Sequence, residues 1–376
     1  MKNITMNYSK KNNVNLKPHK KIRIAIISSP WYSVPPSGYG GIERMIDNIA
    51  VGLKNRGYDI TLFCANGSSS KVRRVFTHKT PLAQKKVPFT DLSGEMSTVQ
   101  LALEYLDTHQ FDIVLSFLSN DYIILPSIDK FNCPVIISAR NVLDTRDYRI
   151  YSKNRKLYKL FGLSSAHTKQ IKNISFDGFV YNGLNTNKYT YSKVGGNYMA
   201  FLGNFMPSKG IMTAISISES LQLPLEIGAK RSVSDFYNFK VKHLIHGIIR
   251  DRGELGDSQK IKLLQNARIL LFPISRPEPF GSVMIESMAC GTPVIAYDEG
   301  SVSEIIKDGE TGYIIPPGDE KAFLLAVKKI YNMTTAQYNK MRSACRRRVE
   351  EYFSISTMID GYEKIIRSSV DPDSKN

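Results

Sequence analysis

The strongest constraint on the fold is an alternation of short apolar runs and amphipathic helical segments along the chain of 376 residues. The first run, 22–27, is almost continuously apolar, as expected for a strand buried on both faces of a parallel sheet. A loop rich in proline and glycine follows, and then a segment with apolar residues at helical spacing from Ile42 to Leu53. This succession predicts a βαβ unit and therefore an α/β fold.

The alternation stops near residue 183 and begins again at residue 198, after a polar linker. A restart of this kind is typical of a second domain. We therefore predict an N-terminal domain over 22–190 and a C-terminal domain over 197–354, each a Rossmann-like unit with a parallel sheet. Two such domains are expected to face each other across a cleft at the carboxyl ends of their strands.

Apolar runs bounded by Gly, Pro and polar residues predict the strands of the first domain: 22–27, 58–64, 111–116, 134–138 and 178–183. The strands expected in the second domain are 198–203, 225–228, 244–249, 269–273, 294–297 and 312–315. Helical spacing predicts the helices 42–53, 97–108, 123–129, 211–221, 258–267, 280–289, 302–307, 320–333, 335–351 and 356–368.

Composition narrows the class of protein further. No apolar run approaches the roughly 20 residues that span a bilayer. The four cysteines are scattered without metal-binding spacing, which predicts reduced thiols and neither a disulfide framework nor a metal site. Residues 1–21 contain six lysines and no acid, and they lack an apolar core segment, so we expect a flexible basic tail and no secretory signal. These features predict a cytoplasmic protein.

The net charge of +17 implies attraction to an anionic partner. The segment 140–172 holds nine Lys and Arg against two acids, with aromatic and aliphatic residues interleaved. Such a segment is compatible with a peripheral contact on an anionic membrane surface, and equally with a solvated helix face. Nucleic acid is the least favoured partner, because no nucleic-acid-binding module accompanies the charge.

The stretch 276–296 contains the most distinctive chemistry. A buried strand is expected to end at Pro273, and Pro277 and Pro279 then impose an extended turn before a helix. The N-terminus of that helix favours a phosphate, while the carboxylates Glu278 and Glu286 suit sugar hydroxyls. The same pattern also fits an ordinary βαβ crossover in which Glu278 only complements the helix dipole.

Lys209 ends a predicted strand-to-helix loop of the same domain. A lysine beside a helix N-terminus can neutralise a diphosphate, although it can also be a surface residue that the dipole mildly disfavours. Gly40 and Gly41 lie after the first strand of the first domain and allow a close approach of the backbone to a ligand. Together these residues suit an activated sugar.

Several motifs now coincide: 35–43 (PPSGYGGIE), 201–203 with 207–210 (FLG and PSKG), 278–286 (EPFGSVMIE) and 291–296 (GTPVIA). With 182–183, 300–304 and 308–312, they make residues 22–368 resemble a glycosyltransferase of family 4 with the two-domain GT-B fold. The resemblance implies a retaining enzyme that uses a nucleotide sugar and no metal or other cofactor. It also implies that the last helix, 355–370, crosses back to the first domain.

The resemblance assigns the ribose to Glu286, the donor sugar to Glu278 and the diphosphate to Lys209. It leaves Glu304 a structural role. The full predicted donor site comprises Gly40, Gly41, Asn204, Lys209, Arg276, Phe280, Gly281, Ser282, Val283 and Glu286, and the residues predicted to be catalytic are Glu278, Lys209 and Arg140. A UDP-sugar is the favoured donor, and the acceptor is expected to be a glycan, a glycolipid or another hydroxyl compound of cell-surface polysaccharide or lipopolysaccharide synthesis.

The chain departs from the family pattern at several positions. Asn204 stands where the family usually has an arginine beside the lysine, and Arg140 lies where many members have a histidine. The histidines often seen around 115–117 are also missing. Loss of a cation should weaken leaving-group stabilisation, so Arg276 and Arg140 are candidates to replace it. The main alternative is a degenerate protein that binds a nucleotide sugar or glycan without turnover. A nucleotide-sugar epimerase on the same fold is less favoured.

Overall fold

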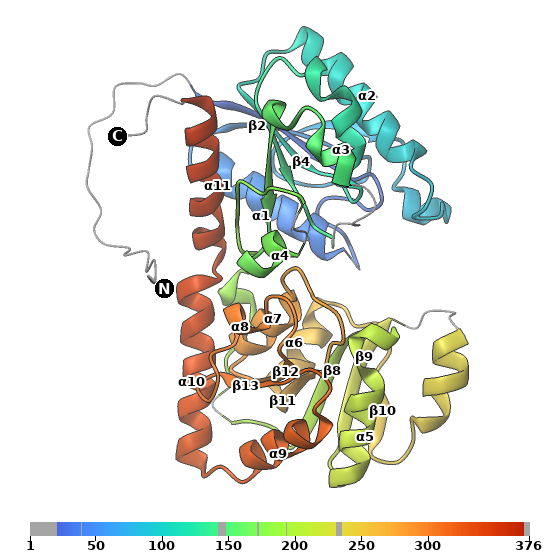
Figure 1. Ribbon diagram of the computed structural model, residues 1–376, viewed down its shortest axis with the longest axis vertical. Helices are drawn as coiled ribbons and strands as arrows, with labels where there is room; N and C mark the ends of the chain where they lie inside the picture. The colour runs from blue at the N-terminus through green and yellow to red at the C-terminus, as the bar shows by residue number, and fades with distance from the viewer. Residues whose placement is uncertain are drawn as a thin grey trace, which may run out of the picture.

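The computed structural model describes residues 21–38, 40–141, 148–170, 173–192, 194–230 and 235–371. Two α/β domains lie one above the other in Figure 1, each built on a parallel sheet. Apart from Lys21, the predicted basic tail lies outside the described residues. The two domains provide the frame on which the predicted site residues are placed.

The N-terminal sheet has seven strands in the order β3-β2-β1-β4-β5-β6-β7, all paired in parallel. The strands are β1 (Arg23–Ser28), β2 (Asp59–Ala65), β3 (Arg73–His78), β4 (Ile113–Phe117), β5 (Val135–Ser138), β6 (Tyr158–Gly162) and β7 (Gly178–Phe179). The central strands are buried on both faces, which is why they are apolar almost throughout.

The structure corrects the predicted strands and helices of this domain at several places. β3 was not predicted, because it is an exposed edge strand with the sequence RRVFTH and has no apolar run. β6 was missed inside the basic segment, where Tyr158 and Leu160 are buried between lysines. The predicted helix 123–129 is a 3-10 helix, η2 (Asp121–Lys130), which contains Pro126. The predicted strand 178–183 pairs over two residues only.

Four α-helices are described in the N-terminal part: α1 (Gly41–Asn55), α2 (Ser93–Thr108), α3 (Tyr148–Ser152) and α4 (Ser165–Lys169). α1 follows directly from the glycine pair and buries Ile46, Ile49 and Leu53 against the sheet. Its apolar stripe thus explains the helical spacing in the sequence. The structure therefore places the start of α1 at the carboxyl end of β1, on the side of the cleft.

The C-terminal sheet has six strands in the order β10-β9-β8-β11-β12-β13, again all parallel. They are β8 (Tyr198–Asn204), β9 (Leu225–Lys230), β10 (Ile249–Asp251), β11 (Ala267–Phe272), β12 (Val294–Tyr297) and β13 (Gly312–Ile315). The α-helices are α5 (Ile211–Leu221), α6 (Asp257–Gln265), α7 (Ser282–Ala289), α8 (Val302–Ile305), α9 (Glu320–Tyr331) and α10 (Thr335–Tyr352). The strand predicted over 244–249 begins only at Ile249. A π-helix (Phe236–Val241) and a 3-10 turn (Lys242–Leu244) come first, and a further turn over 247–248 leads into the strand.

The last helix, α11 (Ile355–Val370), leaves the C-terminal domain and lies along α1 of the N-terminal domain (Figure 1). Its apolar face, including Met358, Ile359 and Tyr362, joins the core of that domain. Beside the crossover between α10 and α11, the Leu184 N–H donates to Phe353 O at 2.9 Å and Ile355 N–H donates to Leu184 O at 3.1 Å. The two points at which the chain passes between the domains are therefore bonded to each other.

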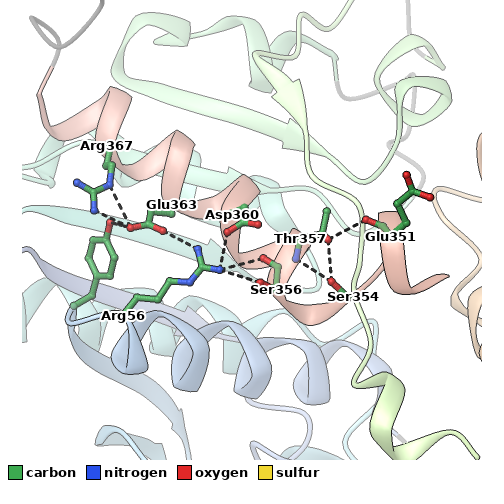
Figure 2. Close-up of polar contacts among 9 residues, drawn as sticks. Arg56, Glu351, Ser354, Ser356, Thr357, Asp360, Glu363 and Arg367 are labelled. Carbon is green, nitrogen blue, oxygen red and sulfur yellow. Dashed lines mark hydrogen bonds and ion pairs between the residues drawn. The ribbon is translucent and has the colours of Figure 1, made fainter. Parts of the chain in front are cut away.

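Polar contacts fix α11 to the end of α1 (Figure 2). Arg56 pairs with Asp360 at 2.6 Å and with Glu363 at 2.7 Å. Glu363 also accepts hydrogen bonds from Tyr58 OH at 2.9 Å and from Arg367 at 2.8 Å. The shared carboxylate holds groups from two distant parts of the chain together, so α11 is an integral part of the N-terminal domain.

Within the described ranges, no helix is both long enough and apolar enough to cross a membrane.

Candidate active site

A cleft of about 290 Å³ lies between the two domains. Residues of both domains line it. Gly41, Ile42, Met45, Arg140, Leu163 and Asn182 come from the N-terminal side. From the C-terminal side come Leu202, Gly203, Lys209, Phe272 and the continuous stretch 278–283. Of the predicted site residues, the structure thus brings Gly41, Arg140, Lys209, Glu278, Phe280, Gly281, Ser282 and Val283 together.

Lys209 and Glu278 form an ion pair in this cleft. Their Nζ and Oε2 atoms are 2.7 Å apart, and the side chains are 19% and 23% exposed. The pair forms because the loop after β8 packs on the turn after β11. A Cβ at Gly210 would lie 1.8 Å from Pro273 O, and the φ of Gly210 is +76°. Only glycine permits that approach at this conformation, so Gly210 sets the position of Lys209.

The turn from Glu278 to Gly281 is held by backbone contacts. Ser301 Oγ donates to Phe280 O at 2.7 Å. Gly300, with φ +62°, lies so close that a Cβ there would be 2.4 Å from Glu278 O. The carboxylate of Glu278 therefore projects from a rigid turn and not from a free loop.

The N-terminus of α7 opens onto the cleft. Its N-cap residue is Gly281, and no side chain caps the helix. Ser282 and Val283, the first helical residues, both line the cleft. The unbonded N–H groups and the positive end of the helix dipole are thus available to an anion beside Lys209.

Arg140 follows β5 and reaches the cleft from the other domain. Its Nη1 donates to Asn182 Oδ1 at 2.9 Å, and its Nη2 donates to Tyr362 OH at 2.6 Å. The guanidinium lies 5.0 Å from the ring centroid of Phe117. Burial lowers the pKa of Arg140, an effect that the Tyr362 hydroxyl opposes.

Four predicted donor residues do not line the cleft. Glu286, on α7, pairs instead with Lys260 at 2.8 Å and accepts from Tyr189 OH at 3.3 Å. Gly40 is buried beneath Pro36, and its φ of +142° leads the chain into α1. Asn204 ends β8, and Arg276 is exposed. Their contacts with a donor stay predictions.

Contacts between the domains flank the cleft. Glu304, on α8, accepts from the N–H groups of Ser165 and Ala166 at the start of α4, at 2.9 and 2.6 Å, and from Tyr181 OH at 2.7 Å. Ser164 Oγ donates to Pro279 O at 2.7 Å. On the other side, Arg44 of α1 pairs with Asp257 of α6 at 3.0 Å. Hydrogen bonds and an ion pair therefore join the two domains beside the cleft that both of them line.

Sequence reasoning did not assign a role to Asn182, Tyr362 or Lys260. In the sequence Asn182 is only part of a motif, and in the structure its Nδ2 donates weakly to Ser282 Oγ at 3.4 Å. Tyr362 occupies an apolar position of the last helix, so its spacing indicates core packing and not a site. Lys260 gives no local signal, because its partner Glu286 is 26 residues away.

No metal-binding cluster of three or more His, Cys, Asp and Glu side chains occurs in the part of the chain that the structure describes. The four cysteines are free. That the reaction proceeds without a metal ion stays a prediction.

The fold and the cleft together define a class: two parallel α/β domains with a cleft between them, in an architecture that binds ligands at the carboxyl ends of its strands. Residues 39–171 match the family "Glycosyltransferase Family 4", and residues 191–350 match "Glycosyl transferases group 1". O-antigen chain mannosyltransferase C of Escherichia coli is 24% identical over 377 residues, which cover 91% of this chain and 97% of that protein.

Solved structures share the fold. Sucrose-phosphate synthase from Thermosynechococcus elongatus superposes with a TM-score of 0.77 at 17% identity, over 93% of this chain and 99% of that one. Anabaena Alr3699/HepE in complex with UDP and glucose gives a TM-score of 0.73 at 16% identity, over 92% and 100%. The chain belongs to the family 4 glycosyltransferases with the GT-B fold, and it is a glycosyltransferase. The predicted family, fold and enzyme class are confirmed.

Proposed function

We propose that this glycosyltransferase moves a sugar, with retention of anomeric configuration and without a metal ion, from a nucleoside diphosphate sugar to a hydroxyl acceptor. A UDP-sugar is the preferred donor, and the acceptor is a glycan or a lipid-linked glycan of cell-surface polysaccharide or lipopolysaccharide synthesis. The observation that carries the proposal is the Lys209–Glu278 pair beside the uncapped start of α7. One cation, one helix dipole and one carboxylate at a single point suit the diphosphate and the sugar of such a donor.

The proposed chemistry follows from where charge develops. When the bond between the anomeric carbon and the phosphate oxygen breaks, negative charge accumulates on the diphosphate. Lys209 Nζ and the free N–H groups of Ser282 and Val283 are placed to stabilise that charge. Glu278 accepts from sugar hydroxyls. The acceptor oxygen forms the new bond to the anomeric carbon on the face from which the diphosphate leaves, and its proton passes to the departing phosphate oxygen. This route requires neither a protein nucleophile nor a metal.

The relatives support the choice of substrates. The Anabaena protein was crystallised with UDP and glucose, and the Escherichia coli relative is a mannosyltransferase of the O-antigen chain. A sugar nucleotide and a surface glycan are therefore reasonable first substrates for this chain.

The proposal is tested by thermal-shift screening of the protein against UDP-, GDP- and ADP-sugars, followed by release of the nucleoside diphosphate with candidate acceptors. We expect one donor to raise the melting temperature, to be turned over in the presence of EDTA, and to give a product whose anomeric configuration by NMR equals that of the donor. Lys209→Met should abolish most turnover, and Lys321→Met, at an exposed position of α9, should not. Binding without turnover for every acceptor would favour the degenerate, non-catalytic alternative.

Peripheral membrane contact through 140–172 also belongs to the proposed function, and the structure narrows it. Tyr151, Tyr158 and Leu160 are buried in the core, so they do not face a membrane. Lys153 and Lys156 are exposed beside Leu157, which is 47% exposed. Sedimentation with phosphatidylglycerol vesicles should pull down the wild type, and Lys153→Glu with Lys156→Glu should weaken it. Equal binding of both proteins would reject this surface.

A further inference from the structure

Arg140 is a buried cation of the cleft that has no countercharge among the described residues. The residue is 7% exposed and lines the cleft. Its contacts are the amide oxygen of Asn182, the hydroxyl of Tyr362 and the ring of Phe117, all of which are neutral. Its Nε atom is buried without a hydrogen-bond partner. A buried guanidinium in these surroundings is unfavourable until a ligand supplies negative charge.

The carboxylate that lines the cleft does not supply this charge to Arg140, because Glu278 is already paired with Lys209 at 2.7 Å. Glu304 is occupied by the start of α4 and by Tyr181, so it is not available to Arg140 either. Among the residues that the structure describes, the cleft therefore carries an excess positive charge, which is located at Arg140.

The guanidinium is also held in place. Asn182 and Tyr362 each bond a different terminal nitrogen, and Ser138 Oγ lies 3.1 Å from Tyr362 OH. Tyr362 comes from α11, which the ion pairs at Arg56 fix to the N-terminal domain (Figure 2). An arginine whose terminal nitrogens are fixed in this way loses little freedom when it binds an anion.

We propose that Arg140 binds an anionic oxygen group of the donor, either the diphosphate or a carboxylate on the transferred sugar, and that Tyr362 is its positioning residue. The inference rests on the proposed function, because it takes the cleft as the donor site. It locates the second cation of that site in the N-terminal domain, where the C-terminal helix supports it, and not at Asn204 or Arg276. The chemical class of ligand is an anion that accepts from a planar guanidinium.

The test is isothermal titration with uridine, UDP, UDP-glucose and UDP-glucuronic acid, and with the guanosine counterparts guanosine, GDP and GDP-mannose. The proteins are the wild type, Arg140→Gln, Arg140→Lys and Tyr362→Phe. Tyr362→Phe keeps the ring that packs 5.8 Å from Phe117 and removes only the hydroxyl. Arg250→Gln is the matched control, because Arg250 is 65% exposed on β10 and lies outside the cleft.

We expect Arg140→Gln to weaken the nucleoside diphosphate about tenfold or more, Tyr362→Phe to weaken it several-fold, and Arg140→Lys to lie between Arg140→Gln and the wild type. The free nucleoside should bind all variants equally. Loss confined to UDP-glucuronic acid, with UDP and UDP-glucose unchanged, would assign the carboxylate instead of the diphosphate and also support the proposal.

Two results would overturn it. In the first, all probes bind Arg140→Gln and Tyr362→Phe within twofold of the wild type. In the second, the free nucleoside is weakened as much as its diphosphate, which would show a merely structural role. If Arg140→Gln does not fold, Tyr362→Phe and Arg140→Lys decide. Failure of the wild type to bind any of the nucleotides would instead refute the proposed function, and this inference with it.

Discussion

The contact of Glu304 with the other domain gives the sharpest prediction about stability. One carboxylate oxygen accepts from Ala166 N–H at 2.6 Å, and the other accepts from Ser165 N–H at 2.9 Å and Tyr181 OH at 2.7 Å. In Glu304→Gln, one of these oxygens becomes an NH₂ group that faces a donor. At least one backbone N–H of α4 then loses its partner, whichever way the amide is oriented.

A hydrogen bond to a charged group contributes about 1.5–3 kcal/mol, so Glu304→Gln should cost about 2 kcal/mol. With an unfolding entropy of about 2.1 cal/mol/K per residue, we expect the melting temperature of a chain of this size to fall by about 2–3 °C. Glu310→Gln is the matched control, because Glu310 is 55% exposed and pairs with Lys307 on the surface. That change should cost no more than about 0.5 kcal/mol.

Differential scanning calorimetry of the three proteins measures these effects, and small-angle scattering of the same samples reports whether the domains separate. We expect Glu304→Gln to melt earlier and to show a larger radius of gyration than Glu310→Gln. Equal melting temperatures and equal radii for the two variants would refute the reasoning that this carboxylate holds the domains together.

Three further predictions concern an ion pair, a tightly packed glycine and a buried carboxyl group. A double-mutant cycle of Lys209→Met and Glu278→Gln should give non-additive losses of kcat/KM, because the two groups are 2.7 Å apart. Lys209→Met alone should lower kcat/KM about 10²–10³-fold, and additive losses in the double variant would contradict a shared role. Gly300→Ala should lower both stability and donor affinity, because the added Cβ would push on the backbone of Glu278. Gly309 has a similar φ of +72° and open space for a Cβ, so Gly309→Ala should lower stability alone. Equal effects of the two variants on donor affinity would reject the packing argument. Burial raises the pKa of Glu43 to about 7 from 4.5, so between these pH values the folded state holds a proton that the unfolded state releases. As the pH rises from 4.5 to 7, the wild type should therefore lose up to about 3 kcal/mol of unfolding free energy relative to Glu43→Gln. Parallel pH profiles of the two proteins in urea denaturation would contradict this.

Much of the fold could be predicted because its signals are local. The apolar run of β1, the helical spacing of α1 and the proline-rich turn before α7 are each set by residues within one short window. β3 and β6 escaped prediction for opposite reasons. β3 is an exposed edge without an apolar run, and β6 places buried residues between lysines, so neither carries the expected pattern.

The site could be predicted only in part, because its remaining contacts are long-range. Lys209 and Glu278 were both singled out, yet the sequence gives no indication that they pair. The bond between Arg140 and Tyr362 joins positions 222 residues apart, and nothing in the last helix distinguishes this tyrosine from a core residue. Residues placed by tertiary packing leave no local trace, so the support for Arg140 appears only in the folded chain.

The central claim is that the diphosphate of the donor lies in the cleft at Lys209, and that its ribose reaches Glu286, one helical turn beyond Ser282 on α7. A crystal structure of the protein with UDP, or with whichever nucleoside diphosphate binds, tests it most directly. We predict phosphate oxygens within about 3.2 Å of Lys209 Nζ and of the N–H groups at the start of α7, and the ribose hydroxyls at Glu286 after the Lys260 contact opens. A nucleotide bound outside this cleft, or bound in it with the Lys209–Glu278 and Lys260–Glu286 pairs unchanged, would contradict the account.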